Sequence, residues 1–312
     1  MEEADRQIPN IRSEQVQGNS SRPNSDVEWA GGCRLLVAAK VVGAMCELLG
    51  LVFNQLVRPS LSFRGFQHRG ADNPNGWGLA AFPDESAQVF KEPLHAAKSE
   101  LATFLCDYQQ LVSKIFIGHV RHGTVGGQTL ANTHPFCHEF RGRHFVFAHN
   151  GTLKADGLRS GLDGRCAPVG KTDSELAMCV LLAWMARENV AFTSFAKIES
   201  QLRQWNHLGT MNVLFSEGDH FFAYHDGNGH KGLSFVRREA PFTHITLKDE
   251  DWEVDLAKEN NPEQRGYVIA TNPLTDENWI QFEMGSLLVF KDGELIYPSQ
   301  EEHAAQEAVP GS

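Results

Sequence analysis

The chain has 312 residues, of which 41% are hydrophobic and 21% are charged. This composition is typical of a globular protein, and the lack of about 18 consecutive apolar residues excludes a helical membrane protein. The formal net charge of -11 and the lack of a basic cluster argue against a nucleic-acid partner, so a small molecule is the expected ligand. The six cysteines are dispersed, without a C-x-x-C pair or a secretion signal, which indicates a reducing, cytoplasmic environment.

Residues 1–44 differ in composition from the rest of the chain. Polar and charged residues dominate their first half, and the apolar stretch that begins at Leu35 is interrupted by Lys40. A signal peptide is therefore not expected. We predict that residues 1–44 form a disordered leader or precede the true start of translation, that residues 45–297 form one domain, and that residues 298–312 are a flexible tail.

From residue 45 onward, short apolar runs alternate with polar turns, which indicates a strand-rich α+β domain. One helix start is marked by Thr172 and Glu175, which have the spacing of a capping box and precede an apolar run that must be buried on most sides. The predicted elements are strand 46–53, helix 95–113, strands 115–120 and 144–148, helix 172–185, strands 213–215, 221–224 and 267–271, and hairpin 287–297 with its turn at Asp292-Gly293.

Several predicted strands run into polar or glycine-rich loops, and one of these loops contains Asn150-Gly151. An isolated Asn-Gly pair is most often a tight hairpin turn. The alternative is an oxyanion hole, in which the Asn150 side-chain amide and the Gly151 N–H stabilise a tetrahedral intermediate. The dipeptide alone does not decide between these two interpretations.

Six of the fourteen histidines lie between His119 and His149, which raises the possibility of a metal site. No H-E-x-x-H or H-x-H pattern is present, and Pro135 makes a helical pair of His134 and His138 improbable. We therefore expect neither a metal nor another cofactor.

Cys46 directly follows an internal methionine, Met45. In a strand-forming run, a cysteine is most often a buried small apolar residue. However, translation from Met45 and removal of that methionine would leave Cys46 at the amino terminus. Its own α-amine, with a pKa of about 7.7 to 8.0, could then accept the thiol proton.

Seven segments in this order resemble the class II glutamine amidotransferases, most closely their stand-alone YafJ-like branch, over residues 45 to about 297. The segments are 45–50 (MCELLG), 68–78 (HRG…NGWG), 118–121 (GHVR), 132–136 (NTHPF), 148–151 (AHNG), 172–175 (TDSE) and 270–275 (ATNPLT). The resemblance implies the N-terminal nucleophile fold, a four-layer αββα sandwich with two antiparallel sheets.

The resemblance also implies a glutamine site, with Cys46 as the nucleophile and Asn150 and Gly151 as the oxyanion hole. Arg121 would bind the substrate carboxylate and Asp173 the substrate ammonium, while Thr124 would lie in the glutamine-binding loop. Two positions depart from the family pattern: Val125 stands where synthase-linked relatives carry a histidine, and Asn272 where an acidic residue or glutamine is expected.

The expected activity is therefore cleavage of the γ-amide of glutamine or of a γ-glutamyl compound through a cysteine thioester. A separate synthase subunit is a possible acceptor of the ammonia. The alternative is a non-catalytic, glutamyl-binding regulatory module in which Cys46 never becomes the amino terminus.

Overall fold

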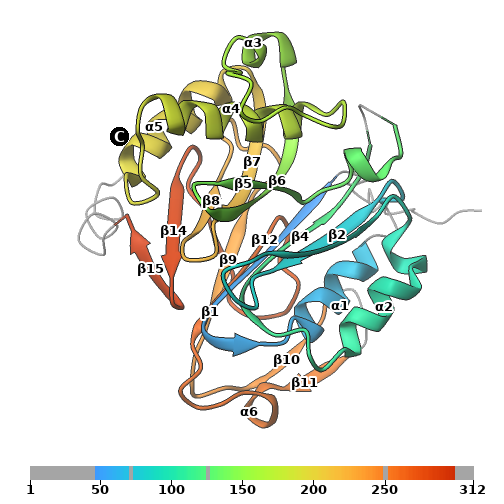
Figure 1. Ribbon diagram of the computed structural model, residues 1–312. Helices are drawn as coiled ribbons and strands as arrows, with labels where there is room; N and C mark the ends of the chain where they lie inside the picture. The colour runs from blue at the N-terminus through green and yellow to red at the C-terminus, as the bar shows by residue number, and fades with distance from the viewer. Residues whose placement is uncertain (1–45, 70–72, 124–126, 249–251, 299–312) are drawn as a thin grey trace, which may run out of the picture. The chain divides into compact units, whose positions relative to one another are not determined.

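Two antiparallel sheets occupy the centre of the structure (Figure 1). This computed structural model describes residues 46–69, 73–123, 127–248 and 252–298, which all belong to the compact unit Gly43–Ser312. The first sheet has seven strands in the order β13-β9-β12-β1-β4-β2-β3, and the second has six in the order β15-β14-β8-β7-β6-β5. The predicted leader, and the predicted tail beyond Pro298, lie outside the described residues.

The strands of the first sheet are β1 (Glu47–Val57), β2 (Trp77–Ala81), β3 (Gln88–Glu92), β4 (Ser113–Val120), β9 (Ser234–Arg238), β12 (Gly266–Ala270) and β13 (Ile280–Gln281). The strands of the second sheet are β5 (Phe136–Phe140), β6 (Arg143–Leu153), β7 (Gly209–Ser216), β8 (Phe221–Tyr224), β14 (Leu287–Lys291) and β15 (Glu294–Tyr297).

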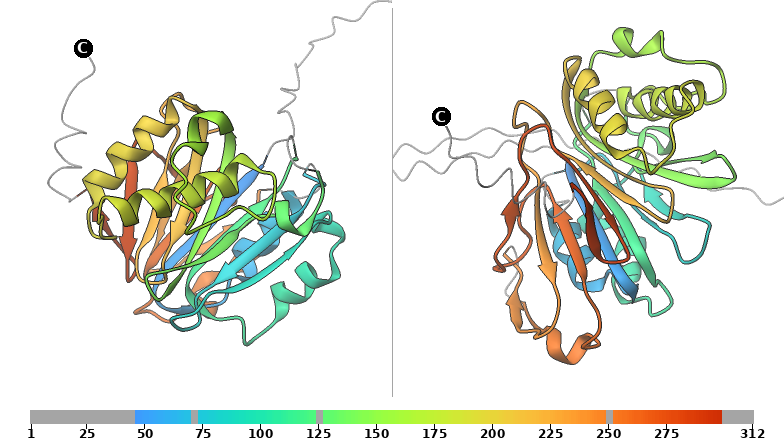
Figure 2. Two further views of the ribbon diagram at one scale, coloured as in Figure 1. Left: turned by 45° about the horizontal axis from the view of Figure 1, so that its top comes forward. Right: turned by 90° about the vertical axis from the view of Figure 1, so that its left-hand side faces the viewer.

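Helices cover the outer face of each sheet (Figure 2). Helices α1 (Ser60–His68) and α2 (Glu100–Asp107) pack on the first sheet, whereas α4 (Asp173–Arg187) and α5 (Phe195–Asn206) pack on the second. The shorter elements are α3 (Ala155–Arg159), α6 (Leu256–Glu259), two 3-10 helices (Ala96–Lys98 and Leu130–Asn132) and the small β10–β11 ribbon (His244–Thr246 and Glu253–Asp255).

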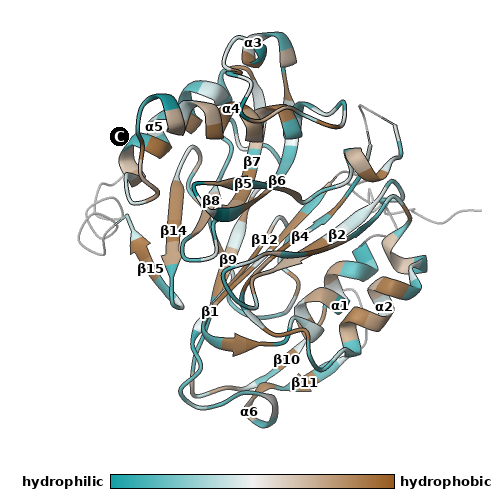
Figure 3. Cartoon of the chain, viewed as in Figure 1, coloured by the Kyte–Doolittle hydropathy of each residue, from teal (hydrophilic) through white to brown (hydrophobic). Residues whose placement is uncertain are grey.

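The four layers follow from the alternation of side chains along each strand. In β1, Leu49 and Leu51 face the helices of the first sheet, while Leu48 and Val52 face the second sheet. Ala148 of β6 meets them from the other side. The hydrophobic colouring of β1 and β14 in Figure 3 reflects these buried faces. The predicted αββα sandwich with two antiparallel sheets is therefore confirmed.

Two local predictions are corrected by the structure. The single helix predicted over residues 95–113 is interrupted, because Ser99 instead caps α2: its hydroxyl accepts a hydrogen bond from the Ala102 amide at 2.9 Å. The turn interpretation of Asn150-Gly151 is wrong, since β6 continues through both residues and pairs them with Asn212 and Met211 of β7.

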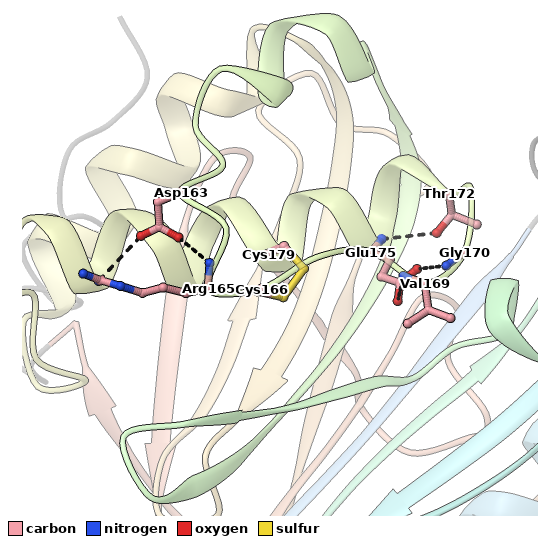
Figure 4. The surroundings of a disulfide bond; sticks show 8 residues. All are labelled: Asp163, Arg165, Cys166, Val169, Gly170, Thr172, Glu175 and Cys179. Atoms are coloured by element: carbon pink, nitrogen blue, oxygen red, sulfur yellow. Dashed lines mark hydrogen bonds and ion pairs between the residues drawn. A yellow bond between two sulfur atoms is a disulfide. The ribbon is translucent and has the colours of Figure 1, made fainter.

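The start of α4 differs in detail from a capping box (Figure 4). The Thr172 hydroxyl accepts from the Glu175 amide at 3.2 Å, as predicted. The Glu175 carboxylate, however, accepts from the amides of Val169 at 3.0 Å and Gly170 at 2.6 Å. Glu175 therefore holds the preceding loop against the helix.

A disulfide joins Cys166 in that loop to Cys179 in α4 (Figure 4). Nothing in the spacing of the cysteines predicts this bond, and it departs from the expectation of reduced cysteines throughout the chain. Among the described residues, no helix combines the length and the apolar character that a bilayer crossing requires.

Candidate active site

Cys46 lies at the beginning of β1, where the space between the two sheets becomes polar. Its sulfur is held by the backbone of His122: the Sγ lies 3.2 Å from the His122 nitrogen and 3.3 Å from its carbonyl oxygen. Because His122 follows the end of β4, the pairing of β1 with β4 brings these two segments together. The thiol is half-buried.

Residues on either side of the site hold the first residues of strand β1 in place. Arg69 pairs with the Glu47 carboxylate at 3.2 Å and donates to the carbonyls of Asn272 at 2.7 Å and Pro273 at 2.6 Å. The Asn272 side-chain amide also donates to Glu47 at 3.0 Å. Asn272, one of the two positions that depart from the family pattern, therefore contacts Glu47 directly.

Asn150 connects the two sheets at the site. Its side-chain amide donates to the carbonyl oxygen of Cys46 at 2.6 Å. Asn150 can reach Cys46 because it lies on the same face of β6 as the inward-facing Val146 and Ala148. The predicted oxyanion residue thus contacts the predicted nucleophile.

Gly151 fits a position that no side chain could occupy, since an added Cβ would lie 2.1 Å from the carbonyl oxygen of Thr210. The amide of Thr152 donates toward β7, whereas that of Leu153 donates to the Asp173 carboxylate at 2.6 Å on the opposite edge. Amides two residues apart on a strand point to the same edge, so the Gly151 N–H points to the edge that also carries Asp173. β5 does not cover this edge, because its pairing with β6 ends at Phe147.

Arg121 follows β4 and is 4% exposed. Its guanidinium donates to the carbonyl oxygens of Gly127 at 2.9 Å and Asn75 at 3.4 Å. Gly123 leaves room for this arrangement, since a Cβ at that position would lie 2.9 Å from Arg121 Nη1. Burial lowers the pKa of Arg121, and the nearby Cys46 acts in the opposite direction.

Asp173 is the first residue of α4, where a carboxylate interacts favourably with the helix dipole. The next residue, Ser174, contacts His149 Nδ1 at 2.9 Å, and His149 Nε2 lies 3.1 Å from the carbonyl oxygen of Thr210. The structure thus places Asp173 beside the Asn150-Gly151 end of β6. Thr124, the residue predicted for the glutamine-binding loop, lies outside the described residues.

Three buried histidines lie near the site, although His149 faces α4 rather than the space between the sheets. The rings of His119 and His134 stack with centroids 4.1 Å apart. Burial, together with His149 and Arg121, lowers the pKa of His119 to about 3, and burial also lowers the pKa of His134 and His149. These imidazoles are therefore neutral at physiological pH.

The histidines do not converge on a metal position within the described residues. The only grouping of three candidate ligands there is Glu217, Asp219 and His220, at the turn between β7 and β8.

Burial raises the pKa of the Cys46 thiol above its usual value. The hydrogen bond from the His122 backbone and the charges of Arg121 and Lys231 act in the opposite direction. A nearby base is therefore needed to produce the thiolate efficiently at neutral pH.

Three residues that shape the site were given no role from the sequence: Thr271, Asn212 and Asp226. Thr271 bridges β12 and β1, since its hydroxyl accepts from the Leu48 amide at 2.9 Å. Asn212 and Asp226 hold the loop that contains Lys231. The available signal for Asn212 was an amide at an inward-facing position of the apolar strand 211–215.

The αββα layers, with a cysteine at the start of a central strand, define the N-terminal nucleophile type of fold. Residues 45–310 match the sequence profile of the class-II glutamine amidotransferases, and the chain belongs to this family. The family assignment made from the seven sequence segments is therefore confirmed.

Two curated relatives align with most of this chain. An uncharacterized protein of Methanocaldococcus jannaschii is 41% identical over 259 residues, which cover 82% of this chain and 72% of that protein. The putative glutamine amidotransferase YafJ of Escherichia coli is 36% identical over 264 residues, which cover 81% of this chain and 100% of that protein.

Solved structures support the same assignment. A predicted glutamine amidotransferase from Pseudomonas aeruginosa has a TM-score of 0.60 and 33% identity, and the match covers 80% of this chain and 99% of that one. The glutamine phosphoribosylpyrophosphate amidotransferase of B. subtilis has a TM-score of 0.56 at 19% identity and is similar in fold alone.

Proposed function

We propose that this protein cleaves the side-chain amide of glutamine, or of a γ-glutamyl compound, through a thioester on Cys46. The observation that carries the proposal is the contact between the Asn150 amide and the Cys46 carbonyl at 2.6 Å, with Gly151 and Asp173 on the adjacent edge of β6. A candidate nucleophile, two oxyanion donors and a counterion for an ammonium group are thus adjacent.

The proposed nucleophile requires Cys46 to be the first residue of the mature chain. Its α-amine then accepts the thiol proton, directly or through water, which offsets the effect of burial on the thiol pKa. We propose that residues 1–45 are removed, or that synthesis starts at Met45 and the methionine is cleaved.

Arg121 and Asp173 are assigned to the two ends of the amino-acid head group. The planar guanidinium of Arg121 suits the α-carboxylate, and the Asp173 carboxylate pairs with the α-ammonium. Thr124 is assigned to the same pocket on the resemblance alone.

In the first step, the Cys46 sulfur bonds to the amide carbon and the carbonyl electron pair moves to oxygen, where Asn150 and Gly151 stabilise the charge. The protonated α-amine of Cys46 returns the proton to the leaving nitrogen as the carbon–nitrogen bond breaks, which releases ammonia or an amine. Water then attacks the thioester, and glutamate and the free thiol are regenerated.

We propose a cytoplasmic enzyme domain spanning residues 45–297, whose ammonia is consumed by a separate synthase or is released by simple hydrolysis.

The test combines the mass of the native protein with the Cys46→Ala and Cys46→Ser variants. We expect a native chain that starts at Cys46, glutamine hydrolysis that is abolished by Cys46→Ala, and little recovery with Cys46→Ser because a hydroxyl ionises far less than a thiol. Cys137→Ala, which removes an exposed free thiol, is the matched control and should retain activity.

A homogeneous preparation that retains Met1 and hydrolyses glutamine at the full rate would contradict the mechanism. If the native chain retained residues before Cys46 and bound glutamine without cleaving it, the regulatory-module alternative would hold instead.

A further inference from the structure

The loop between β8 and β9 is built around a buried carboxylate. Asp226 is fully buried, and its oxygens accept from the Asn206 side chain at 2.7 Å and from the amides of Met211 at 2.6 Å, Asn228 at 2.7 Å and His230 at 3.2 Å. These contacts tie the loop of residues 226–232 to β7 and to α5, so its conformation is well defined.

Lys231 occupies an unusual backbone conformation in this loop. Its φ is +62°, while Gly229 and Gly232 on either side have φ of +72° and +79°. Glycine adopts such angles without steric cost, whereas lysine does not. Lys231 therefore occupies a position at which glycine would be less strained.

Asn212 holds Lys231 from both sides. Its side-chain amide, which is fully buried, donates to the carbonyl oxygens of His230 at 2.7 Å and Gly232 at 3.3 Å. Its oxygen accepts from the Asp226 amide at 2.9 Å.

The register of β6 and β7 brings this loop next to the nucleophile. Asn150 and Asn212 are directly opposite each other, so their side chains leave the same face of the sheet at about 5 Å separation. The Asn150 amide binds the Cys46 carbonyl, and the Asn212 amide binds the two peptides that flank Lys231. Two neighbouring side chains therefore bind Cys46 and the 226–232 loop, which places this loop next to the start of β1.

We infer that Lys231 is a positioning residue whose ammonium group stabilises the negative charge on Cys46 Sγ, an inference that rests on the proposed function. Burial raises the pKa of this thiol, and the hydrogen bond from the His122 backbone, the charge of Arg121 and the charge of Lys231 lower it. In the proposed complex the substrate carboxylate neutralises Arg121. Lys231 and the protonated Cys46 α-amine are then the positive groups that remain near the sulfur.

The direct test measures the rate of Cys46 alkylation by iodoacetamide against pH, with the Cys46 peptide quantified by mass spectrometry. Removing a cation disfavours the thiolate, so Lys231→Met should raise the thiol pKa by about half a unit to one unit, which is a three- to tenfold slower reaction at neutral pH. Lys231→Gly, which relaxes the backbone, should give the same shift, and Lys231→Arg should restore the parental profile.

The matched control is Lys197→Met, which removes an exposed lysine of α5 and should leave the profile unchanged. The inference is overturned if Lys231→Met and the parent have superimposable profiles, if only one of the Met and Gly variants shifts, or if Lys197→Met shifts equally. The measurement is made on the full chain and on the chain that starts at Cys46.

Glutamine hydrolysis separates this inference from the proposed function. In an active preparation, Lys231→Met should lower kcat at neutral pH by about the same factor as the alkylation rate and leave KM unchanged. A raised KM with an unchanged alkylation profile would assign Lys231 to substrate binding and overturn the inference. If no preparation hydrolyses glutamine, the proposed function fails, while the alkylation profiles still report on Lys231.

Discussion

The space between the two sheets is filled differently at its two ends. Near Cys46, the inward-facing positions carry polar groups such as His119, Asn150 and Asn212. Toward the other end they carry aromatic rings, including Phe221 and Phe290. The change from apolar to polar occurs between successive inward-facing positions of a strand, as between Ala148 and Asn150 in β6.

The two ends of this space therefore differ in how much their side chains contribute to the stability of the fold. Buried apolar side chains stabilise the fold, whereas buried imidazoles and amides need partners and contribute little net stability. His134 illustrates the cost, since neither of its ring nitrogens has a hydrogen-bond partner among the described residues. The aromatic end therefore contributes most of the stability. Substitutions there should lower the free energy of unfolding, whereas substitutions at the polar end should mainly reduce activity.

The largest expected effect is a loss of stability at the aromatic end. Phe221 is fully buried and its ring rests on Gly50, so Phe221→Ala should lower the free energy of unfolding by about 3 to 5 kcal/mol. Urea titration at pH 7 measures this value. Phe104→Ala, which truncates a ring that is 55% exposed, should change it little. A comparable loss in both variants would remove the contrast.

At the polar end, Arg121→Ala and Asp173→Asn should reduce activity much more than stability. If the proposed head-group contacts form, each variant removes a charge-assisted contact worth roughly 1.5 to 3 kcal/mol, or about tenfold to a few hundredfold in kcat/KM. The Asp173→Asn variant keeps an oxygen that can accept from the Leu153 amide. Its decrease in activity therefore measures the effect of removing the negative charge. Steady-state kinetics with glutamine and a γ-glutamyl amide should show parallel losses, with Arg159→Ala as the control. Losses confined to one substrate would refute the head-group assignment.

The buried histidines predict a loss of stability in acid. The pKa of His119 is about 3 in the folded chain and about 6.5 when unfolded, so the unfolded state binds the proton first. The free energy of unfolding is therefore not reduced by His119 above about pH 6.5. It falls as the pH decreases toward 3, by roughly 2 kcal/mol at pH 5 for this residue alone.

Urea titrations at pH 7 and pH 5 measure this decrease. It should be smaller in His119→Gln, whereas His207→Gln, which alters an exposed histidine, should behave as the parent. An equal decrease in all three proteins would assign it to other groups.

The smallest expected effect concerns the start of α4. Thr172→Ala removes the hydrogen bond to the Glu175 amide and should cost about 1 kcal/mol. Ser194 at the start of α5 makes no side-chain capping bond, so Ser194→Ala should cost less. Thermal unfolding of the two variants compares them, and equal shifts would show that the Thr172 bond contributes nothing.

Local alternation and apolar runs predicted about half of the strands in the described residues, whereas the four layers were expected only from the resemblance to the class II glutamine amidotransferases. The sequence could not distinguish a turn at Asn150-Gly151 from a continuous strand, because that outcome depends on pairing with β7, some sixty positions further along the chain. The same limit applies to Lys231 and Asn212, whose contacts are set by register rather than by local spacing. The Cys166–Cys179 bond likewise depends on how the loop folds back on α4.

The uncovered edge of β6 has a consequence for self-association. A strand edge with free amides can recruit another strand, and such edges are commonly blocked by charged side chains. Here Asp173 accepts from the Leu153 amide and places a negative charge at that edge. The same carboxylate that is proposed to bind substrate therefore also makes the edge a poor template for pairing with a second chain.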